Sequence, residues 1–259
     1  MLVFLPFLYF RPQNTTQQYL LSMKYVKIAL KSLLVLILFL GLSLAGLYYS
    51  YDQELPQGTQ GVEADLLAKK MLEAMNYQAY KELDYIAWTF SSRGRCRSYK
   101  WNKNQGRCKV LWDSISVDLN IKALKKSSVQ VNGSVYTGKL KDDFIRAAEA
   151  EFNNDSFWLV APYKLFDAGV ERRLVKQDNG EDALLVTYKS GGTTPGDSYL
   201  WLLDDNHRPR AFQMWVSILP IGGIEASWEQ WEKTAKGAYL PRLHQLSVLD
   251  LEITGLKTY

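Results

Sequence analysis

The sequence is poor in the residues that build metal sites and disulfide-rich scaffolds. Its 259 residues include only two cysteines, Cys96 and Cys108, and two histidines, His207 and His244. Two cysteines exclude a disulfide-dense scaffold, and two thiolates with no nearby histidine do not supply the four ligands of a structural zinc site. We therefore expect neither a metal nor a cofactor.

Familiar catalytic motifs are also missing. The sequence has no G-x-S-x-G and no H-E-x-x-H, and the glycine-rich stretch from Gly191 to Asn206 lacks the Gly-Lys-Ser/Thr ending of a phosphate loop. Asp155, Asp167 and Asp197 could meet in space as paired carboxylates, but no pattern selects them. We assign no catalytic residue and expect a protein that is not an enzyme, with a carboxylate-based hydrolase as the minor alternative.

The amino-terminal part has no acidic residue before Asp52. Its charges are Arg11, Lys24, Lys27 and Lys31, so 27 of the 31 Lys and Arg remain for the rest of the chain, against 27 Asp and Glu. The net charge of +4 therefore belongs to the amino-terminal segment. A formally neutral remainder offers no electrostatic case for binding nucleic acid.

Charge is absent altogether from Ser32 to Tyr51. As a helix these 20 residues would rise about 30 Å, the thickness of a bilayer hydrocarbon core. Cations precede the run, and tyrosines crowd its far end like an interfacial aromatic belt. The positive-inside rule predicts residues 1–31 in the cytoplasm, a single-pass signal anchor over 32–51 in the inner (cytoplasmic) membrane, a linker over 52–61 and an extracytoplasmic β-rich domain over 62–259.

Two alternatives concern this segment. Residues 1–22 are too short an apolar patch to span, and they are interpreted as a possible mis-start with Met23 as the real beginning. Ser43-Leu44-Ala45 also fits a small-x-small signal-peptide cleavage site, which would release the domain into the periplasm after Ala45. A lipoprotein is disfavoured because Leu47 stands where an acylated cysteine would be needed.

The domain combines helical and alternating patterns. Apolar residues at helical spacing predict helices over 63–80 and from about 139 to 152. Period-two alternation predicts roughly nine to eleven strands, among them 86–90, 117–121, 159–162, 211–217 and 243–253. The fold class is α+β, a curved, mostly antiparallel open sheet (a half-barrel) covered by about two helices and preceded by one N-terminal transmembrane helix.

Cys96 and Cys108 bracket a predicted turn over 102–106, and export makes a disulfide chemically possible. Whether this disulfide can form depends on which residues face each other across the hairpin. If Trp101 faces Arg107, then Cys96 faces Trp112, whereas a hairpin centred near Asn102 brings the two thiols opposite. The same hairpin is rich in Arg and Lys, which predicts either a solvated edge or a surface for anionic head groups.

Aromatic residues are the abundant class. All eight Trp lie after Asp52, several at alternating strand positions. They can fill a core or line a wide apolar pocket. For the pocket we expect Trp158, Trp201, Trp215 and Met71 to form the wall.

The order of elements is familiar: an export segment, an amphipathic helix, a long meander, the stretch NNDSFWLVAPYKLFDAGV and a last hairpin entered through GAYLP. Over roughly residues 62–255 this resembles uncharacterised bacterial envelope proteins whose exported domain is similar to the periplasmic lipoprotein carrier LolA and its receptor LolB. The resemblance implies an unclosed barrel with helices as a lid and a cavity for acyl chains. It brings no catalytic residue. The chain departs from this pattern in two ways: a retained anchor conflicts with a carrier that shuttles freely, and the missing lipobox cysteine conflicts with the receptor.

These patterns lead to one expected function and one alternative. We expect a membrane-anchored protein whose domain binds an apolar or lipid-like ligand in the half-barrel. The alternative is an envelope scaffold or protein-interaction module with a filled core, acting through loops such as Gly191 to Ser198, with a protein partner that the sequence does not identify.

Overall fold

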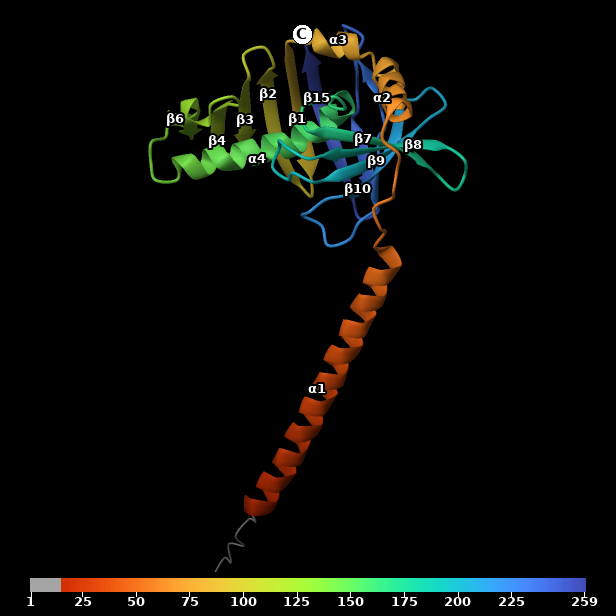
Figure 1. Ribbon diagram of the computed structural model, residues 1–259. Coiled ribbons are helices and arrows are strands. Elements are labelled where there is room, and N and C mark those ends of the chain that lie inside the picture. The colour runs from red at the N-terminus through yellow and green to blue at the C-terminus, as the bar shows by residue number, and fades with distance from the viewer. Residues whose placement is uncertain (1–14) are drawn as a thin grey trace, which may run out of the picture. The chain divides into compact units, whose positions relative to one another are not determined.

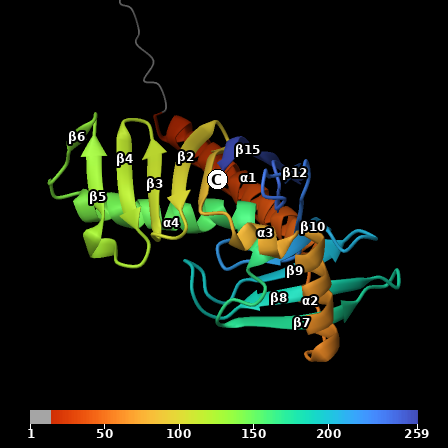
Figure 2. The ribbon, with the colours of Figure 1, turned by 90° about the horizontal axis from the view of Figure 1, so that it is seen from above.

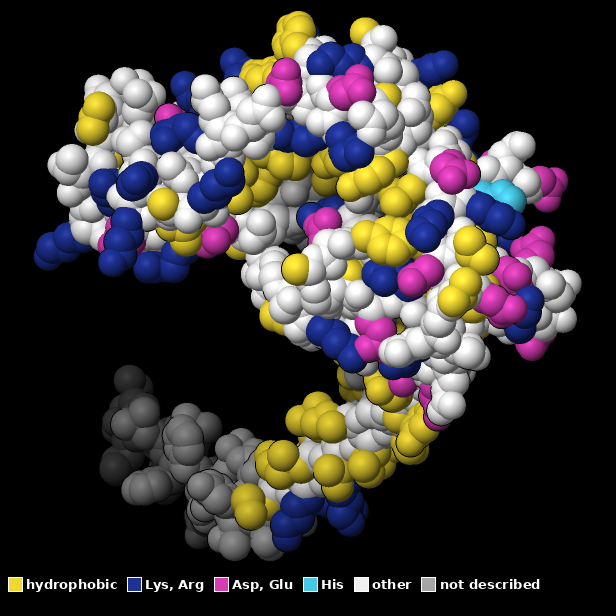
Figure 3. Space-filling view, turned by 45° about the horizontal axis from the view of Figure 1, so that its top comes forward, with side chains coloured by type: hydrophobic (Ala, Val, Ile, Leu, Met, Phe, Trp, Pro, Cys, Tyr) yellow, Lys and Arg dark blue, Asp and Glu magenta, His cyan; other side chains and the backbone are white. Residues whose placement is uncertain are grey.

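The computed structural model describes residues 15–259 and divides at Asp52 into two compact units. The first contains helix α1 (Thr15–Tyr51). Within it, Met23–Tyr51 is long and apolar enough to cross a membrane or to serve as a signal sequence. Its described large hydrophobic side chains are exposed, Phe39 by 68% and Leu42 by 74%, and Figure 3 shows them along the helix. Such a surface needs an apolar environment. Residues 1–14, and with them part of the proposed mis-start, lie outside the described residues.

The second unit, Gln53–Tyr259, is built on antiparallel sheets (Figure 1). The larger sheet has eight strands in the spatial order β14-β15-β1-β2-β3-β4-β5-β6. The bounds are β1 Tyr85–Ser92, β2 Arg95–Asn102, β3 Arg107–Trp112, β4 Ile115–Asn120, β5 Ser128–Val131, β6 Ser134–Val135, β14 Leu243–Leu246 and β15 Leu249–Thr258. The last strand therefore lies inside the sheet, between β14 and β1.

The smaller sheet has five strands in the order β11-β10-β9-β8-β7. The bounds are β7 Val170–Lys176, β8 Asp182–Tyr188, β9 Ser198–Leu203, β10 Pro209–Trp215 and β11 Ile224–Ser227, and a separate pair joins β12 Glu232–Lys233 to β13 Tyr239–Leu240. Edge strands of the two main sheets meet where His244 Nδ1 lies 2.9 Å from the carbonyl oxygen of Ser227. Neither sheet closes on itself.

Helices cover the sheets in two places. Figures 1 and 2 show α4 (Lys141–Val160) crossing one face of the larger sheet, where it contacts β3, β4 and β5, and α2 (Val62–Ala74) against the smaller sheet at β7 and β8. The short elements are α3 Tyr77–Lys81, η1 Leu124–Lys126 and η2 Ala161–Tyr163. The prediction of an α+β fold with a large antiparallel sheet and few helices is confirmed.

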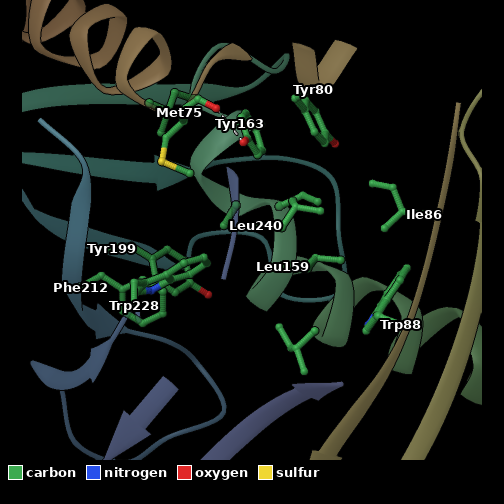
Figure 4. Close-up of a cluster of buried hydrophobic side chains, with 14 of the residues drawn as sticks. Met75, Tyr80, Ile86, Trp88, Leu159, Tyr163, Tyr199, Phe212, Trp228 and Leu240 are labelled. Carbon is green, nitrogen blue, oxygen red and sulfur yellow. Dashed lines mark hydrogen bonds between the residues drawn. The ribbon is translucent and has the colours of Figure 1, made fainter. Parts of the chain in front are cut away.

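One continuous hydrophobic core joins these layers. Alternation along β1 buries Ile86, Trp88 and Phe90, as period-two spacing requires. Figure 4 shows side chains from the end of α2, from α4 and from both sheets pointing into this interior, with Leu159 of α4 near its middle. The other face of the smaller sheet carries a separate cluster that includes Val175, Leu185 and Leu200.

Three predicted elements were wrong in detail. Residues 159–162 are not a strand, because α4 continues to Val160 and η2 follows. The apolar run is short enough to suit either structure, and burial of Leu159 and Val160 against the sheets favours the helix. The strand predicted over 243–253 is a hairpin of β14 and β15, and the helix predicted over 63–80 breaks at Asn76, whose φ is 54°.

The register of the β2–β3 hairpin separates the two cysteines considered for a disulfide, Cys96 and Cys108. The β2–β3 register pairs Trp101 with Cys108, while Cys96 pairs with Ser91 of β1. The two cysteines are therefore out of register and both are free, Cys96 exposed and Cys108 buried. A hairpin centred near Asn102 would have been needed to place the sulfurs opposite each other.

Candidate ligand-binding interior

The four residues predicted for a cavity wall lie in three different environments. Met71 of α2 and Trp201 of β9 are fully buried in the main core. Trp158 of α4 is half-buried and packs against that core. Trp215, at the end of β10, lies with the cluster on the other face of the smaller sheet. The structure thus brings Met71, Trp158 and Trp201 to one interior and excludes Trp215 from it.

Trp158 belongs to an aromatic cluster centred on Trp228. The ring centroid of Trp228 lies 5.0 Å from that of Trp201, 5.5 Å from Phe212 and 6.4 Å from Trp158. The inward-facing positions of β9 and β10 place Trp201 directly opposite Phe212 in the antiparallel register. Edge-to-face and tilted contacts of this kind add about 0.5–1.5 kcal/mol per pair to the burial of the rings.

His244 closes this cluster on the β14 side. Its ring centroid lies 4.4 Å from Trp228 and 5.1 Å from Trp158. Burial lowers the pKa of His244 to about 4, so the imidazole is neutral near pH 7. Because a carbonyl oxygen only accepts, Nδ1 carries the proton and donates to Ser227.

A polar group lies on the inner side of β2, where sequence reasoning found only a basic hairpin. The carboxylate of Asp155, a residue of α4 with 0% exposure, receives two hydrogen bonds from Arg97, with Nε to Oδ2 at 2.7 Å and Nη2 to Oδ1 at 3.1 Å. The hydroxyl of Tyr99 donates to the same Oδ2 at 2.5 Å. Arg97 and Tyr99 are two apart on one strand, and this spacing places both side chains on the same face.

The electrostatics of this group follow from its burial. Burial raises the pKa of the Tyr99 hydroxyl, and the charge of Asp155 raises it further, so Tyr99 stays a donor. Burial alone would lower the pKa of Arg97, but the hydrogen bond and charge of Asp155 outweigh it and raise that pKa overall. Glu151 Oε2 lies 3.2 Å from Arg97 Nη2, and burial raises the pKa of this carboxyl while Arg97 opposes the shift.

The predicted carboxylate candidates do not pair with one another. Asp155 pairs with Arg97, Asp167 forms an exposed ion pair with Lys164, and Asp197 Oδ1 accepts the backbone N–H of Ser217 at 2.9 Å. Among residues 15–259, no group of three or more His, Cys, Asp or Glu is placed to hold a metal ion.

Two surface clefts of about 400 and 410 Å³ lie outside this interior. The first is polar and lies beside β7, with Asp65, Glu171, Arg172 and Lys189 in its wall. The second lies beside α2 and α3, at Leu72, Asn76 and Tyr77. Neither is lined by the four predicted residues. Figure 3 also shows a hollow near the middle of the domain surface, with hydrophobic side chains gathered beside it.

Comparison with known proteins gives only distant structural similarity. No family model and no curated protein sequence matches the chain. Among solved structures, a DUF1329 family protein from Desulfovibrio piger aligns with 75% of this chain and 92% of its own, with 10% sequence identity and a TM-score of 0.38. A similarity of this size does not establish the family to which the chain belongs.

Proposed function

We propose that this protein is a membrane-tethered extracytoplasmic domain that binds an apolar, lipid-like ligand between its sheets and helices. In this proposal the two sheets act as one curved half-barrel, joined where β11 meets β14, and α2 and α4 cover its inner side. The protein acts by binding and not by catalysis.

The tether rests on α1. Its uncharged stretch from Ser32 matches the hydrocarbon thickness of a bilayer, and the lysines before it favour a cytoplasmic amino-terminal side in the inner membrane. Cleavage after Ala45 is the alternative, and it would leave the same domain free in the periplasm. Amino-terminal sequencing of the mature protein, together with extraction of membranes by alkaline carbonate, distinguishes the two.

The observation that carries ligand binding is the chemistry of the interior. The indole nitrogens of Trp88, Trp201 and Trp228 are buried with no hydrogen-bond partner among the described residues. Buried donors of this kind are costly unless an acceptor reaches them. Ester or head-group oxygens of an amphiphile would supply such acceptors, while its chains would contact the surrounding aliphatic and aromatic side chains.

A ligand can enter this interior only if part of the domain moves, because Met71 and Trp201 are fully buried in the described structure. Helix α2 is the best candidate lid. Its residues Ala68 and Met71 are fully buried, and so is Met75, which directly follows the helix. Methionine side chains are flexible and polarizable, and they adapt to a changed partner at low cost. Opening α2 would expose the aromatic cluster to a ligand.

Lipid retention tests this function. The full chain is purified in mild detergent, extracted with organic solvent and analysed by mass spectrometry. We expect a stoichiometric lipid or other amphiphile in the wild type and in Trp215→Ala, the matched control from the other sheet face, and a clear loss in Trp158→Ala. Protein that carries no amphiphile, before and after incubation with an extract of membrane lipids, contradicts the proposal.

A second function is favoured by how completely the interior is filled. If Met71 and Trp201 never become accessible, the domain acts through its surface as an interaction module. The Gly191–Ser198 loop would then be the contact site, and Asn153 of α4 supports it through a 3.2 Å hydrogen bond from Nδ2 to Thr193 Oγ1. Cross-linking in whole cells that captures one partner, and loses it when this loop is replaced, would select this function.

A further inference from the structure

The loop between β10 and β11, residues 216–223, is unusually apolar for an exposed loop. No charged residue occurs from Ala211 to Ile224. At its tip Ile218 is 69% exposed and Leu219 is 36% exposed. Scattered apolar residues on a surface are ordinary, but consecutive exposed ones in an uncharged loop indicate a surface that contacts an apolar partner.

Hydrogen bonds hold this loop in shape. The N–H of Ser217 donates to Asp197 Oδ1 at 2.9 Å, and Asp197 is only 5% exposed. The N–H of Leu219 donates to the carbonyl of Val216 at 3.1 Å, and that of Gly223 donates to Met214 at 2.9 Å. The carboxylate of Asp197 is thus buried at the base of the loop, and the exposed side chains of Ile218 and Leu219 at its tip are apolar.

The base of the loop is bound to the first residue of the domain. The N–H of Gln53 donates to the carbonyl of Gly222 at 3.1 Å, and Trp215 Nε1 donates to the carbonyl of Gln53 at 2.7 Å. Packing here leaves no room for a side chain on Gly222, since a Cβ would lie 2.3 Å from Trp215 Cδ1. The loop and the start of the domain therefore form one fixed unit.

Chain connectivity then limits how far this unit can be from the apolar helix. Helix α1 ends at Tyr51, and a single residue separates Tyr51 from Gln53. Two extended residues span roughly 7 Å, which is comparable to the thickness of one interfacial layer of a bilayer. Leu55, which follows directly, is also 41% exposed.

We propose that Ile218 and Leu219 insert into the outer leaflet of the membrane that α1 spans, so that the loop is a second membrane contact of the domain. This inference rests on the tether proposed above. The partner is the lipid bilayer itself, because the loop carries no charge to select a head group and is fixed within two residues of the end of the apolar helix. A second contact would restrict how the domain rotates about its tether.

Site-specific fluorescence in vesicles tests the insertion. The full chain carrying Cys96→Ser is reconstituted into vesicles of phosphatidylethanolamine and phosphatidylglycerol, and an environment-sensitive fluorophore is attached through Ile218→Cys or, in a second variant, Leu219→Cys. Cys108 is fully buried and does not compete. The control is Val248→Cys, at an apolar residue that is 81% exposed in the turn between β14 and β15.

We expect blue-shifted emission at positions 218 and 219, largely lost when the lipids carry quenching spin labels, and unshifted, unquenched emission at 248. Water-like emission at 218 and 219 from a chain that resists carbonate extraction overturns the loop insertion and leaves the tether intact. A chain released by carbonate overturns the tether, and the loop inference with it.

Discussion

Asp155 Oδ2 accepts hydrogen bonds from both Arg97 Nε and the Tyr99 hydroxyl, so three side chains from α4 and β2 share one buried charge. The carboxylate has no exposed surface, whereas the Arg97 side chain keeps 15%. This arrangement fixes the position of α4 on the larger sheet, because moving the helix would separate an ion pair in a poorly solvated place.

Removing one partner of this pair should therefore be costly. We expect Asp155→Ala to lower the free energy of unfolding by about 3–5 kcal/mol, because Tyr99 would lose its buried acceptor and Arg97 would keep only the partly exposed Glu151 as counter-ion. The measurement is urea unfolding of the full chain in detergent micelles, followed by tryptophan fluorescence. Asp143→Ala removes the exposed Asp143–Arg146 pair of the same helix and should cost less than about 1 kcal/mol. Equal losses in the two variants would contradict this role.

The buried imidazole of His244 predicts a loss of stability in acid. Its pKa is lowered to about 4 in the fold and is about 6.5 in an unfolded chain. The unfolded state therefore binds the proton first as the pH falls. The contribution is fully present above pH 6.5 and is lost progressively toward pH 4, by roughly 3 kcal/mol in all.

The same unfolding measurement at several pH values isolates this contribution. His244→Asn keeps an N–H donor for the carbonyl of Ser227 but does not titrate, so it should flatten the wild-type slope between pH 4 and 6.5. His207→Asn is the control, since His207 lies in the turn before β10 at φ 61°, a conformation that asparagine also adopts. An unchanged slope in His244→Asn would show that other groups dominate.

Tyr163 links the end of α2 to β13. Its hydroxyl lies 2.9 Å from the carbonyl oxygen of Met75 and accepts the N–H of Tyr239 at 3.0 Å. Tyr163→Phe removes these contacts and leaves only the longer hydrogen bond from the Tyr239 N–H to the Met75 carbonyl, at 3.4 Å, so it should cost about 1–3 kcal/mol. Tyr77→Phe, at a ring in the same stack, should cost clearly less. Comparing the urea midpoints of the two variants checks this.

The free cysteines predict a simple labelling pattern. Cys96 is exposed, while Cys108 is buried and burial raises the pKa of its thiol. Without any reductant, we expect a maleimide to add once to the native chain and twice to the unfolded chain, as counted by mass spectrometry. If the unfolded chain accepts no label until it is reduced, Cys96 and Cys108 form a disulfide and this prediction is wrong.

The sequence predicted those parts of the fold that depend on local periodicity. Alternation at Ile86, Trp88 and Phe90 was enough to place β1 and its buried face. The end of α4 was misassigned because Leu159 and Val160 form a short apolar run that period alone cannot resolve. The disulfide depended on hairpin register, which a difference of one residue in turn length changes.

The candidate site was less predictable for a related reason. Met71, Trp158 and Trp201 share one interior, whereas Trp215 ends β10 and packs with the cluster on the other face. The partnership of Arg97 with Asp155 joins residues 58 positions apart, and no local pattern indicates it. The position of Arg97 on β2 and that of Asp155 on α4 predict at most which face of the strand or helix carries each side chain.

The place of β15 in the larger sheet has a consequence for how the domain forms. Ile86 of β1 pairs with Thr258 of β15, so the centre of this sheet joins segments made early and late in synthesis. Until the last strand has been synthesised, β1 presents an open edge to its surroundings. Assembly of the larger sheet must therefore wait until nearly all of the chain has been made, so a chain shortened by its last ten residues could not complete it.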